Sequence, residues 1–380
     1  MNPSEAEPPV QRVADERRPG TIAVVVVNYN GARTVLDTLD SLFRQRGVAV
    51  SVIVVDDGST DGSPDAIARQ YPAVEIHREP RNTKEVNRLR NIGLARATAD
   101  KILVTDNDVV FETDCIAELV RAMDADRRVA LCLPRMMYAQ TPDTVYMAGG
   151  RIHYAGATIA PNRHEPFDGR TEPRPAIGGG IVLLDRRKLS EVGGFDEGYR
   201  LAWGDDVELH QRLLLAGYEC LYVPTAVCLH EYKPFDGTRA YRARGQVGNR
   251  WRYLLTHYEA RTLLLILPAL VLYEIVQATF LMLKGMPHLY VAGTLDAILA
   301  LPSIVKRRRE VQALRVVPDR DVLFAGPMYV RPEHAHGFDV AARAVATLSA
   351  TFAAYWRLVR PLLSSGARER SRRLSARPEG

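Results

Sequence analysis

The stretch Val50-Ser-Val-Ile-Val-Val-Asp-Asp-Gly58 is an apolar, β-branched run that stops at two aspartates and a glycine. Such a run predicts a strand buried on both faces, as in a parallel sheet. A second β-branched run occupies residues 22–27, and between the two runs apolar residues recur at helical spacing over 35–43. The three segments together predict a β-α-β unit.

The same alternation continues toward the C-terminus. Further strands are predicted at 74–77 and 101–105, with helices beginning near Pro64 and spanning about 84–97. Residues 134–175 are rich in Gly, Pro and Arg and predict loops or short antiparallel strands. The remaining predicted elements are a glycine-rich entry to a strand at 177–184, a short helix at 187–192, a helix from Asp206 to about Ala216 and a strand over 220–229. The sequence therefore predicts an α/β fold whose mostly parallel sheet has helices on both faces.

The composition is that of a globular protein with a modest positive charge. Of its 380 residues, 47% are hydrophobic and 25% are charged, and the formal net charge is +5. Arginine dominates the cations, which favours anionic ligands, although a GC-rich genome has the same effect. The four cysteines show no CxxC pairing, so a reducing compartment is expected. Residues 1–20 lack the apolar core of a signal peptide and predict a disordered leader on a chain that starts in the cytoplasm.

The region after about residue 235 has a different character. Residues 262–283 and 289–305 are apolar, and positive charge flanks both stretches. This arrangement favours a hairpin or helices lying in the membrane interface over a single crossing, with a soluble helical subdomain as the alternative. The expected division is a leader at 1–20, a catalytic domain at 21–235, a mainly helical apolar region at 236–363 and a disordered basic tail at 364–380.

Acidic residues follow two of the predicted strands. Asp106 and Asp108 end the strand at 101–105, and Asp56 and Asp57 end the strand at 50–55. Ligands of open α/β sheets collect at the carboxyl ends of strands, so these acids are expected to converge on one edge. Carboxylates suit Mg²⁺ or Mn²⁺, which also hold phosphate oxygens. The alternative is that the acids only cap turns.

Six motifs resemble, in chain order, those of the family 2 glycosyltransferases, which are inverting enzymes with the A-type nucleotide-sugar-binding fold. They are Val-Val-Asn-Tyr-Asn (26–30), Val-Val-Asp-Asp-Gly-Ser-Thr-Asp (54–61), Arg-Asn-Ile-Gly (90–93), Thr-Asp-Asn-Asp (105–108), Gly-Gly-Phe-Asp-Glu (193–197) and Trp-Gly-Asp-Asp-Val-Glu-Leu (203–209). The chain is most similar to the rhamnosyltransferase-like and galactofuranosyltransferase-like branches. The C-terminal regions of these branches often carry membrane-associated helices.

The resemblance implies a role for individual residues. Asp206 would be the catalytic base, at the start of a helix whose dipole keeps an acid ionised. A nucleoside diphosphate sugar would be bound by Asn28, Asp56, Asp57, Arg90, Asp106, Gly179 and Gly180. Asp106, Asp108 and His230 would hold Mn²⁺ or Mg²⁺, and Trp203 and Asp205 would contact the acceptor. His210 is expected only to pack on the helix.

The expected function is thus metal-dependent, inverting transfer of a hexosyl or deoxyhexosyl group to a hydroxyl of a glycolipid or a growing cell-surface glycan. The enzyme would act at the cytoplasmic face of the membrane and would not bind nucleic acid. A dinucleotide-dependent oxidoreductase is excluded, because the turn Asn28-Tyr-Asn-Gly31 is not G-x-G-x-x-G. A sugar nucleotidyltransferase would need a glycine-rich, basic turn there. A catalytically silent, membrane-bound assembly partner remains the alternative.

Overall fold

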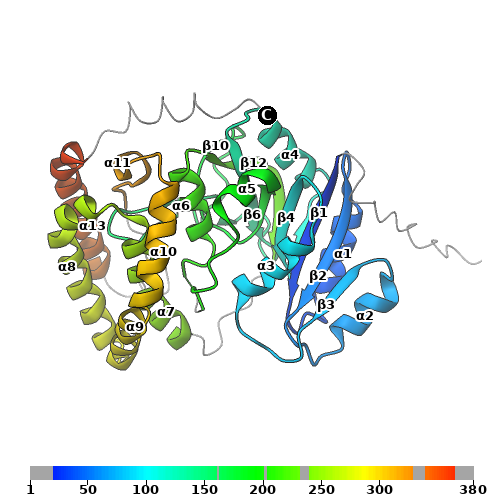
Figure 1. Cartoon of the computed structure of the whole chain (residues 1–380), viewed down its shortest axis with the longest axis horizontal. Coiled ribbons are helices and arrows are strands. Elements are labelled where there is room, and N and C mark those ends of the chain that lie inside the picture. Colours follow the sequence, from blue (N-terminus) through cyan, green and yellow to red (C-terminus); the bar gives the residue numbers. More distant parts are fainter. Residues whose placement is uncertain (1–19, 161, 201–202, 232–238, 328–338, 364–380) are drawn as a thin grey trace, which may run out of the picture.

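A computed structural model describes residues 20–160, 162–200, 203–231, 239–327 and 339–363 (Figure 1). The expected disordered tail lies outside these residues, as does the expected leader apart from Gly20. All the named strands lie between Thr21 and His230, and the named elements from Arg239 onward are all helical.

A ten-stranded sheet forms the first half of the molecule. Its order is β10-β12-β6-β11-β4-β1-β2-β3, with β5 beside β12 and β7 beside β6. Strands β3, β2, β1 and β4 are parallel to one another, whereas β11 runs antiparallel to both β4 and β6. The predicted α/β fold with a mostly parallel sheet is confirmed. The strands are β1 (Thr21–Asn28), β2 (Ala49–Asp56), β3 (Glu75–Arg78), β4 (Lys101–Asp106), β5 (Val109–Phe111), β6 (Val129–Tyr138), β7 (Val145–Met147), β10 (Arg174–Pro175), β11 (Val182–Asp185) and β12 (Glu219–His230), and a separate pair joins β8 (Arg151–Ile152) to β9 (Thr158–Ile159).

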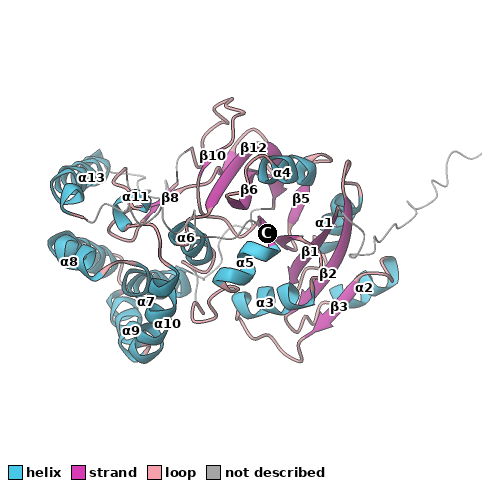
Figure 2. Cartoon of the chain, turned by 45° about the horizontal axis from the view of Figure 1, so that its top comes forward, coloured by secondary structure: helices cyan, strands magenta, loops and turns pink. Residues whose placement is uncertain are grey.

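Helices cover both faces of this sheet (Figure 2). They are α1 (Val35–Phe43), α2 (Ser63–Gln70), α3 (Val86–Arg96), α4 (Cys115–Asp124), α5 (Arg186–Val192) and α6 (Val207–Leu215). The strand register pairs Asn28 with Asp56 and Val27 with Asp106. The acidic strand ends therefore meet at one edge, as the sequence predicts.

The prediction of loops or short strands from residue 134 onward is wrong for its first part. Strand β6 continues through Pro134 to Tyr138 and pairs in parallel with β12. Proline has no N–H for the ladder, and the register on β12 jumps from Val223 to Val227 where the pairing passes from Pro134 to Arg135. The irregularity in the partner strand accommodates a proline that would otherwise end the strand.

The C-terminal region is helical, as predicted. Helix α8 is long and apolar enough to cross a membrane, with a mean hydropathy of 2.0, and only 22% of its most apolar window is buried. The stretch expected at 289–305 is divided between α9 and α10, which are bent by 61° where one ends and the next begins. The helices are α7 (Arg239–His257), α8 (Ala260–Leu283), α9 (Pro287–Leu299), α10 (Leu301–Leu314), α11 (Asp319–Val322), α13 (Asp339–Val359) and a final 3-10 turn at Arg360–Leu362.

The helical region shares one hydrophobic core with the sheet. The cluster that contains Val25 and Ile102 of the sheet also contains Ile266 of α8 and Trp356 of α13. The Trp356 ring stacks on Tyr154 with centroids 4.7 Å apart, and the Tyr154 hydroxyl donates to the Phe352 carbonyl at 2.9 Å. The two regions expected from the sequence are therefore packed as one continuous body.

All four cysteine side chains are buried and none is in a disulfide. Cys115 and Cys228 lie in the core on one side of the sheet together with Cys132, whereas Cys220 lies in the core on the other side. Burial raises the pKa of the Cys132 thiol to about 12 and also raises the pKa of the other three thiols. These thiols therefore have little thiolate character.

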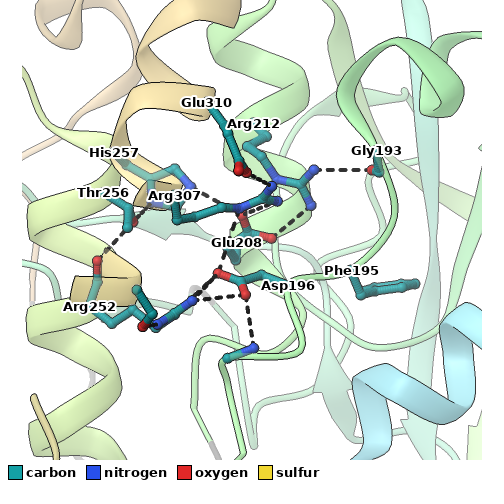
Figure 3. Close-up of polar contacts among 12 residues, drawn as sticks. Gly193, Phe195, Asp196, Glu208, Arg212, Arg252, Thr256, His257, Arg307 and Glu310 are labelled. Carbon is teal, nitrogen blue, oxygen red and sulfur yellow. Dashed lines mark hydrogen bonds and ion pairs between the residues drawn. The ribbon is translucent and has the colours of Figure 1, made fainter. Parts of the chain in front are cut away.

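A buried cluster of charges joins the sheet-containing half of the molecule to the helical region (Figure 3). Glu208 and Arg212 of α6 are fully buried and form a two-pronged ion pair, with N–O distances of 2.6 and 2.8 Å. Glu208 also lies 3.5 Å from His257 Nε2 of α7 and 3.5 Å from Arg307 Nη2 of α10. Burial disfavours ionisation of Glu208, but Arg212 and then His257 hold its pKa below the usual range.

The same cluster fixes the loop after α5. Arg212 donates to the carbonyls of Val192, Gly193 and Gly194 at 2.5 to 3.0 Å. Asp196, three residues after Gly193, accepts from Arg252 of α7 at 2.9 Å and lies 3.7 Å from Arg307. The Gly-Gly-Phe-Asp-Glu motif at 193–197 is thus held by arginines from three helices.

We expect Arg212→Ala to lower the free energy of unfolding by about 3–5 kcal/mol, because it leaves the Glu208 carboxylate with fewer partners in a buried setting. Urea denaturation followed by circular dichroism measures this loss. The matched control is Arg121→Ala, which breaks the exposed Arg121–Glu118 pair and should cost only about 0–1 kcal/mol. Equal effects of the two substitutions would contradict a structural role for the cluster.

Candidate active site

Asn28 ties together the strand ends that form the floor of the site. It is buried at the end of β1, and its Nδ2 donates to Asp56 Oδ1 at 2.7 Å and to Ser63 Oγ at 3.0 Å. Its Oδ1 accepts from Asn107 Nδ2 at 2.7 Å. One amide therefore fixes the ends of β1, β2 and β4 relative to one another.

The two aspartates at the end of β2 are buried and shape the surrounding loops. Asp56 accepts hydrogen bonds from Ser59 N at 2.9 Å and from Ser59 Oγ at 2.5 Å. Asp57 accepts from the backbone and hydroxyl of Thr83 at 2.8 and 2.7 Å and from Lys84 N at 3.1 Å. Both carboxylates thereby fix the backbone around the region where a nucleoside is predicted to bind.

Arg90 of α3 is the buried cation at the centre of the predicted site. Its guanidinium lies 3.2 Å from Asp205 and 3.8 Å from Asp106, and it stands 5.3 Å from the centroid of the Phe195 ring. Burial disfavours its charge, but Asp106, Asp205 and Asp206 together raise its pKa. The structure thus brings Asp106, Asp205 and Asp206 around one arginine.

The pKa of the Asp205 carboxyl is also raised, which for an acid disfavours the charged form. Burial, and after it the neighbouring charge of Asp206, raise its pKa to about 6, although Arg90 opposes the shift. Its backbone carbonyl accepts from Asn87 Nδ2 at 3.0 Å, which ties the turn before α6 to α3. Asp205 therefore changes protonation close to neutral pH.

Asp206 lies at the start of α6, where the sequence places it, and its side chain caps the N-terminus of the helix. Its Oδ1 accepts from Val207 N and its Oδ2 accepts from Gly179 N, both at 2.8 Å. Gly178 and Gly179 adopt φ values of +97° and +108°, which L side chains rarely adopt. A Cβ at Gly180 would stand 2.7 Å from Arg90 Nη2, so the loop also requires glycine where it meets the arginine.

His210 differs from its expectation, because it does more than pack on α6. It is fully buried, and its Nδ1 accepts from Gly178 N at 2.9 Å. Sequence reasoning missed this contact. Its only sequence signal is a position one turn after Asp206, on the same helix face.

Asp108 and His230 approach each other at the end of β12. His230 Nε2 lies 3.7 Å from Asp108 Oδ1, and the imidazole stacks flat on Tyr146 with centroids 4.5 Å apart. Asp106, whose side chain is 38% exposed, instead faces Arg90. Within the described ranges no three His, Cys, Asp or Glu side chains are grouped closely enough to hold a metal ion. Carboxylate oxygen and imidazole nitrogen nevertheless are donors that fit Mn²⁺.

Trp203 lies half-buried against the helical region. Its indole N–H donates to Thr158 Oγ1 at 3.2 Å, and its carbonyl accepts from Asn249 of α7 at 2.9 Å. Its ring meets Tyr253 edge-on with centroids 6.0 Å apart. These contacts show a packing role, and the contact of Trp203 with an acceptor stays a prediction.

A separate cleft of about 680 Å³ opens between α3, α5 and α10. Its lining includes Leu94, Arg186, Phe195 and Lys306, and none of the predicted site residues. The site around Arg90, Asp106, Asp205 and Asp206 is therefore distinct from this cleft.

Two family models match consecutive parts of the chain. Residues 23–191 match the glycosyl transferase family 2 model, and residues 164–236 match the model of the N-terminal domain of galactosyltransferase. Together they cover the sheet and α6.

Two relatives from Mycobacterium tuberculosis are each 28% identical to this chain. The N-acetylglucosaminyl-diphospho-decaprenol L-rhamnosyltransferase aligns over 55% of this chain and 75% of its own length. The pre-mycofactocin glycosyltransferase aligns over 56% of this chain but only 43% of its own length.

Two solved structures share the fold, each with a TM-score of 0.52. S. aureus TarS in complex with UDP-GlcNAc is 14% identical, and the match covers 78% of this chain and 84% of TarS. GalNAc-T7 with UDP, GalNAc and Mn²⁺ is 20% identical, and the match covers 63% of this chain and 48% of that chain.

The raised pKa of Asp205 makes the stability of the protein depend on pH. The folded state binds a proton at Asp205 more tightly than the unfolded state, whose aspartate pKa is about 4. The stabilisation from this proton is complete below about pH 4 and is lost as the pH rises through about 6. We therefore expect wild type to lose stability relative to Asp205→Asn over this range, measured by urea unfolding at several pH values.

The control for this measurement is Asp65→Asn, which removes a carboxylate from an exposed ion pair with Arg78. The difference between this variant and wild type should stay nearly constant over the same range. If the difference in stability between Asp205→Asn and wild type is also constant over this range, the raised pKa of Asp205 is contradicted.

Proposed function

This chain is a family 2 glycosyltransferase, and we propose that it performs metal-dependent, inverting transfer of a hexosyl or deoxyhexosyl group from a nucleoside diphosphate sugar to a hydroxyl acceptor. The observation that carries the proposal is the position of Asp206. Its carboxylate stands at the N-terminus of α6, is held by Gly179 N–H, and shares one polar site with Arg90 and Asp106.

Asp206 is the general base of the proposed reaction. Its two hydrogen bonds, accepted from Val207 N and Gly179 N, fix the direction of the carboxylate at the N-terminus of α6. Each carboxylate oxygen accepts one backbone N–H and keeps a further lone pair for the acceptor hydroxyl. The hydroxyl oxygen attacks the anomeric carbon, its proton passes to Asp206, and the nucleoside diphosphate leaves from the opposite face with the bonding electrons.

The donor is proposed to lie across the edge formed by β1, β2 and β4. Asn28, Asp56 and Asp57 fix the backbone on the nucleoside side. On the sugar side, Arg90 supplies a buried positive charge, and Gly179 and Gly180 allow the backbone to approach the donor closely.

Asp106, Asp108 and His230 would hold Mn²⁺ or Mg²⁺, which supplies positive charge to the leaving diphosphate. The pairing of Asp108 with His230 supports this assignment, as does the solved GalNAc-T7 complex, which contains Mn²⁺ with UDP. His230 is held in place by its stack on Tyr146.

The acceptor is proposed to be a lipid-linked or growing cell-surface glycan, approached from the side of Trp203 and Asp205. The relative that acts as an N-acetylglucosaminyl-diphospho-decaprenol L-rhamnosyltransferase supports a lipid-linked acceptor. The division of the chain into a catalytic domain at 21–235 and a membrane-associated region at 236–363 belongs to the same proposal.

We propose that the enzyme acts at the cytoplasmic face of the membrane, and the surface of the helical region supports contact with a membrane. Among the described residues, every large hydrophobic side chain that is markedly exposed, except Tyr29, lies between Leu264 and Leu362. The most exposed include Leu264, Leu283 and Leu299, at 71%, 82% and 79%. Apolar patches of this kind mark interaction surfaces, and adjacent cations such as Lys284 and Lys306 suit anionic lipid head groups.

A screen of nucleoside diphosphate sugars with Mn²⁺ or Mg²⁺, read by release of nucleoside diphosphate, tests the transferase reaction. Asp206→Asn should lower turnover by about a thousandfold or more while donor binding persists, because an amide cannot take the proton of the acceptor hydroxyl. Asp108→Ala should remove the metal dependence of donor binding, measured by calorimetry.

The control is Asp65→Asn, which changes a surface carboxylate far along the chain from the predicted base and should keep wild-type turnover. Full turnover by Asp206→Asn would contradict the assigned base. Absence of donor binding across the whole panel would instead favour a silent assembly partner.

Membrane binding is tested by sedimentation with vesicles that contain anionic lipid. Introducing glutamate at Leu264, Leu283 and Leu299 together should weaken sedimentation by about tenfold or more, because each buried apolar side chain contributes about 1.5–3 kcal/mol. Tyr29→Glu is the matched control, since it makes the same kind of change at an exposed side chain outside this surface. Unchanged sedimentation of the triple variant would contradict a lipid contact.

A further inference from the structure

Helix α6 holds the loop at 178–180 with two side chains. Asp206 Oδ2 accepts from Gly179 N at 2.8 Å, and His210 Nδ1 accepts from Gly178 N at 2.9 Å. Asp206 and His210 are four residues apart and so lie on one face of the helix. The two consecutive backbone N–H groups of the loop therefore point at the same helix face.

The far side of this loop meets the donor-binding arginine. A Cβ on Gly180 would stand 2.7 Å from Arg90 Nη2 and 3.8 Å from Asp106 Oδ2. The loop is thus fitted between α6 and Arg90 with no room for a side chain. A shift of the loop would alter the distance between the base on one side and the donor-binding groups on the other.

His210 holds Gly178 without adding a charge. It is fully buried, and burial lowers its pKa to about 4, so the ring is neutral at physiological pH. Because Nδ1 accepts a hydrogen bond, the ring proton is on Nε2. A carboxylate in this place would add a further negative charge near Asp206 and Glu208, whereas the imidazole offers the same kind of acceptor in neutral form.

The polar contacts of His210 are restricted to the loop. Its Nε2 is buried and has no hydrogen-bond partner among the described residues. A buried N–H without a partner is unfavourable, so an apolar side chain would suit this position better on stability grounds alone. The contact with Gly178 is what a histidine supplies here and a leucine does not.

We propose that His210 is a positioning residue of the transfer reaction, which fixes the Gly178 N–H and with it the 178–180 loop between Asp206 and Arg90. The proposal rests on the proposed function for its effect on turnover, but the clamp itself can be measured without any substrate. Loss of the clamp displaces the donor relative to the base, and a displacement of about 1 Å costs about a hundredfold in rate.

Three variants test this role. His210→Leu removes the acceptor, and His210→Asn restores a neutral acceptor atom close to the position of Nδ1. Gln211→Leu is the matched control, because Gln211 is the next residue of α6, is fully buried, and its amide has no hydrogen-bond partner in the described part of the chain. Each protein is assayed for hydrogen exchange in the peptide that contains Gly178–Gly180, and for kcat and donor KM.

In His210→Leu we expect faster exchange in this peptide, with kcat lowered about a hundredfold and donor KM changed much less. His210→Asn and Gln211→Leu should both stay close to wild type in exchange and turnover. If His210→Leu resembles Gln211→Leu in exchange, or lowers kcat without changing exchange, the positioning role is overturned. If exchange changes as expected but wild type turns over no donor, the clamp stands and the proposed function fails.

Discussion

The buried carboxylate of Glu208 is the constraint on which the rest of the structure depends. Because it is fully buried, it requires the nitrogen-bearing side chains that surround it, and these come from three helices: Arg212 from its own helix, His257 from α7 and Arg307 from α10. Arg212 also donates hydrogen bonds to the carbonyls of Val192 and Gly194, and so links Glu208 to the end of α5 and the loop after it. One ionised group thereby fixes the relative positions of four helices.

Helix α6 carries both the buried ion cluster and the proposed catalytic base. Its Glu208 and Arg212 face the ion cluster, whereas Asp206 and His210 face the loop at 178–180. Eight of the nine residues of α6 are buried, including the polar residues Glu208, His210 and Arg212, and only Leu214 is partly exposed. A helix enclosed in this way has little freedom to rotate or slide, so the proposed base keeps a fixed position relative to Arg90 and to the C-terminal helices.

The sequence predicted the sheet well because β-branched runs and strand-end acids follow local rules. The meeting of Asp56 with Asp106 at one edge follows directly from parallel pairing. The sequence could not show that β6 continues through Pro134, because this depends on an irregularity in β12, about ninety residues later in the chain. The sequence also did not reveal the contacts of His210 with Gly178 or of Glu208 with His257 and Arg307. These partners are brought close only by tertiary packing.

The burial of all four native thiols has a practical consequence. Thiol-reactive probes attack the thiolate, and the raised pKa values together with burial keep Cys115, Cys132, Cys220 and Cys228 unreactive in the folded state. A cysteine introduced on an outward-facing turn of α8 or α9 would therefore be the only thiol available for labelling. Fluorescent or spin labels can then report the depth of each helix in a lipid bilayer while the native core stays intact.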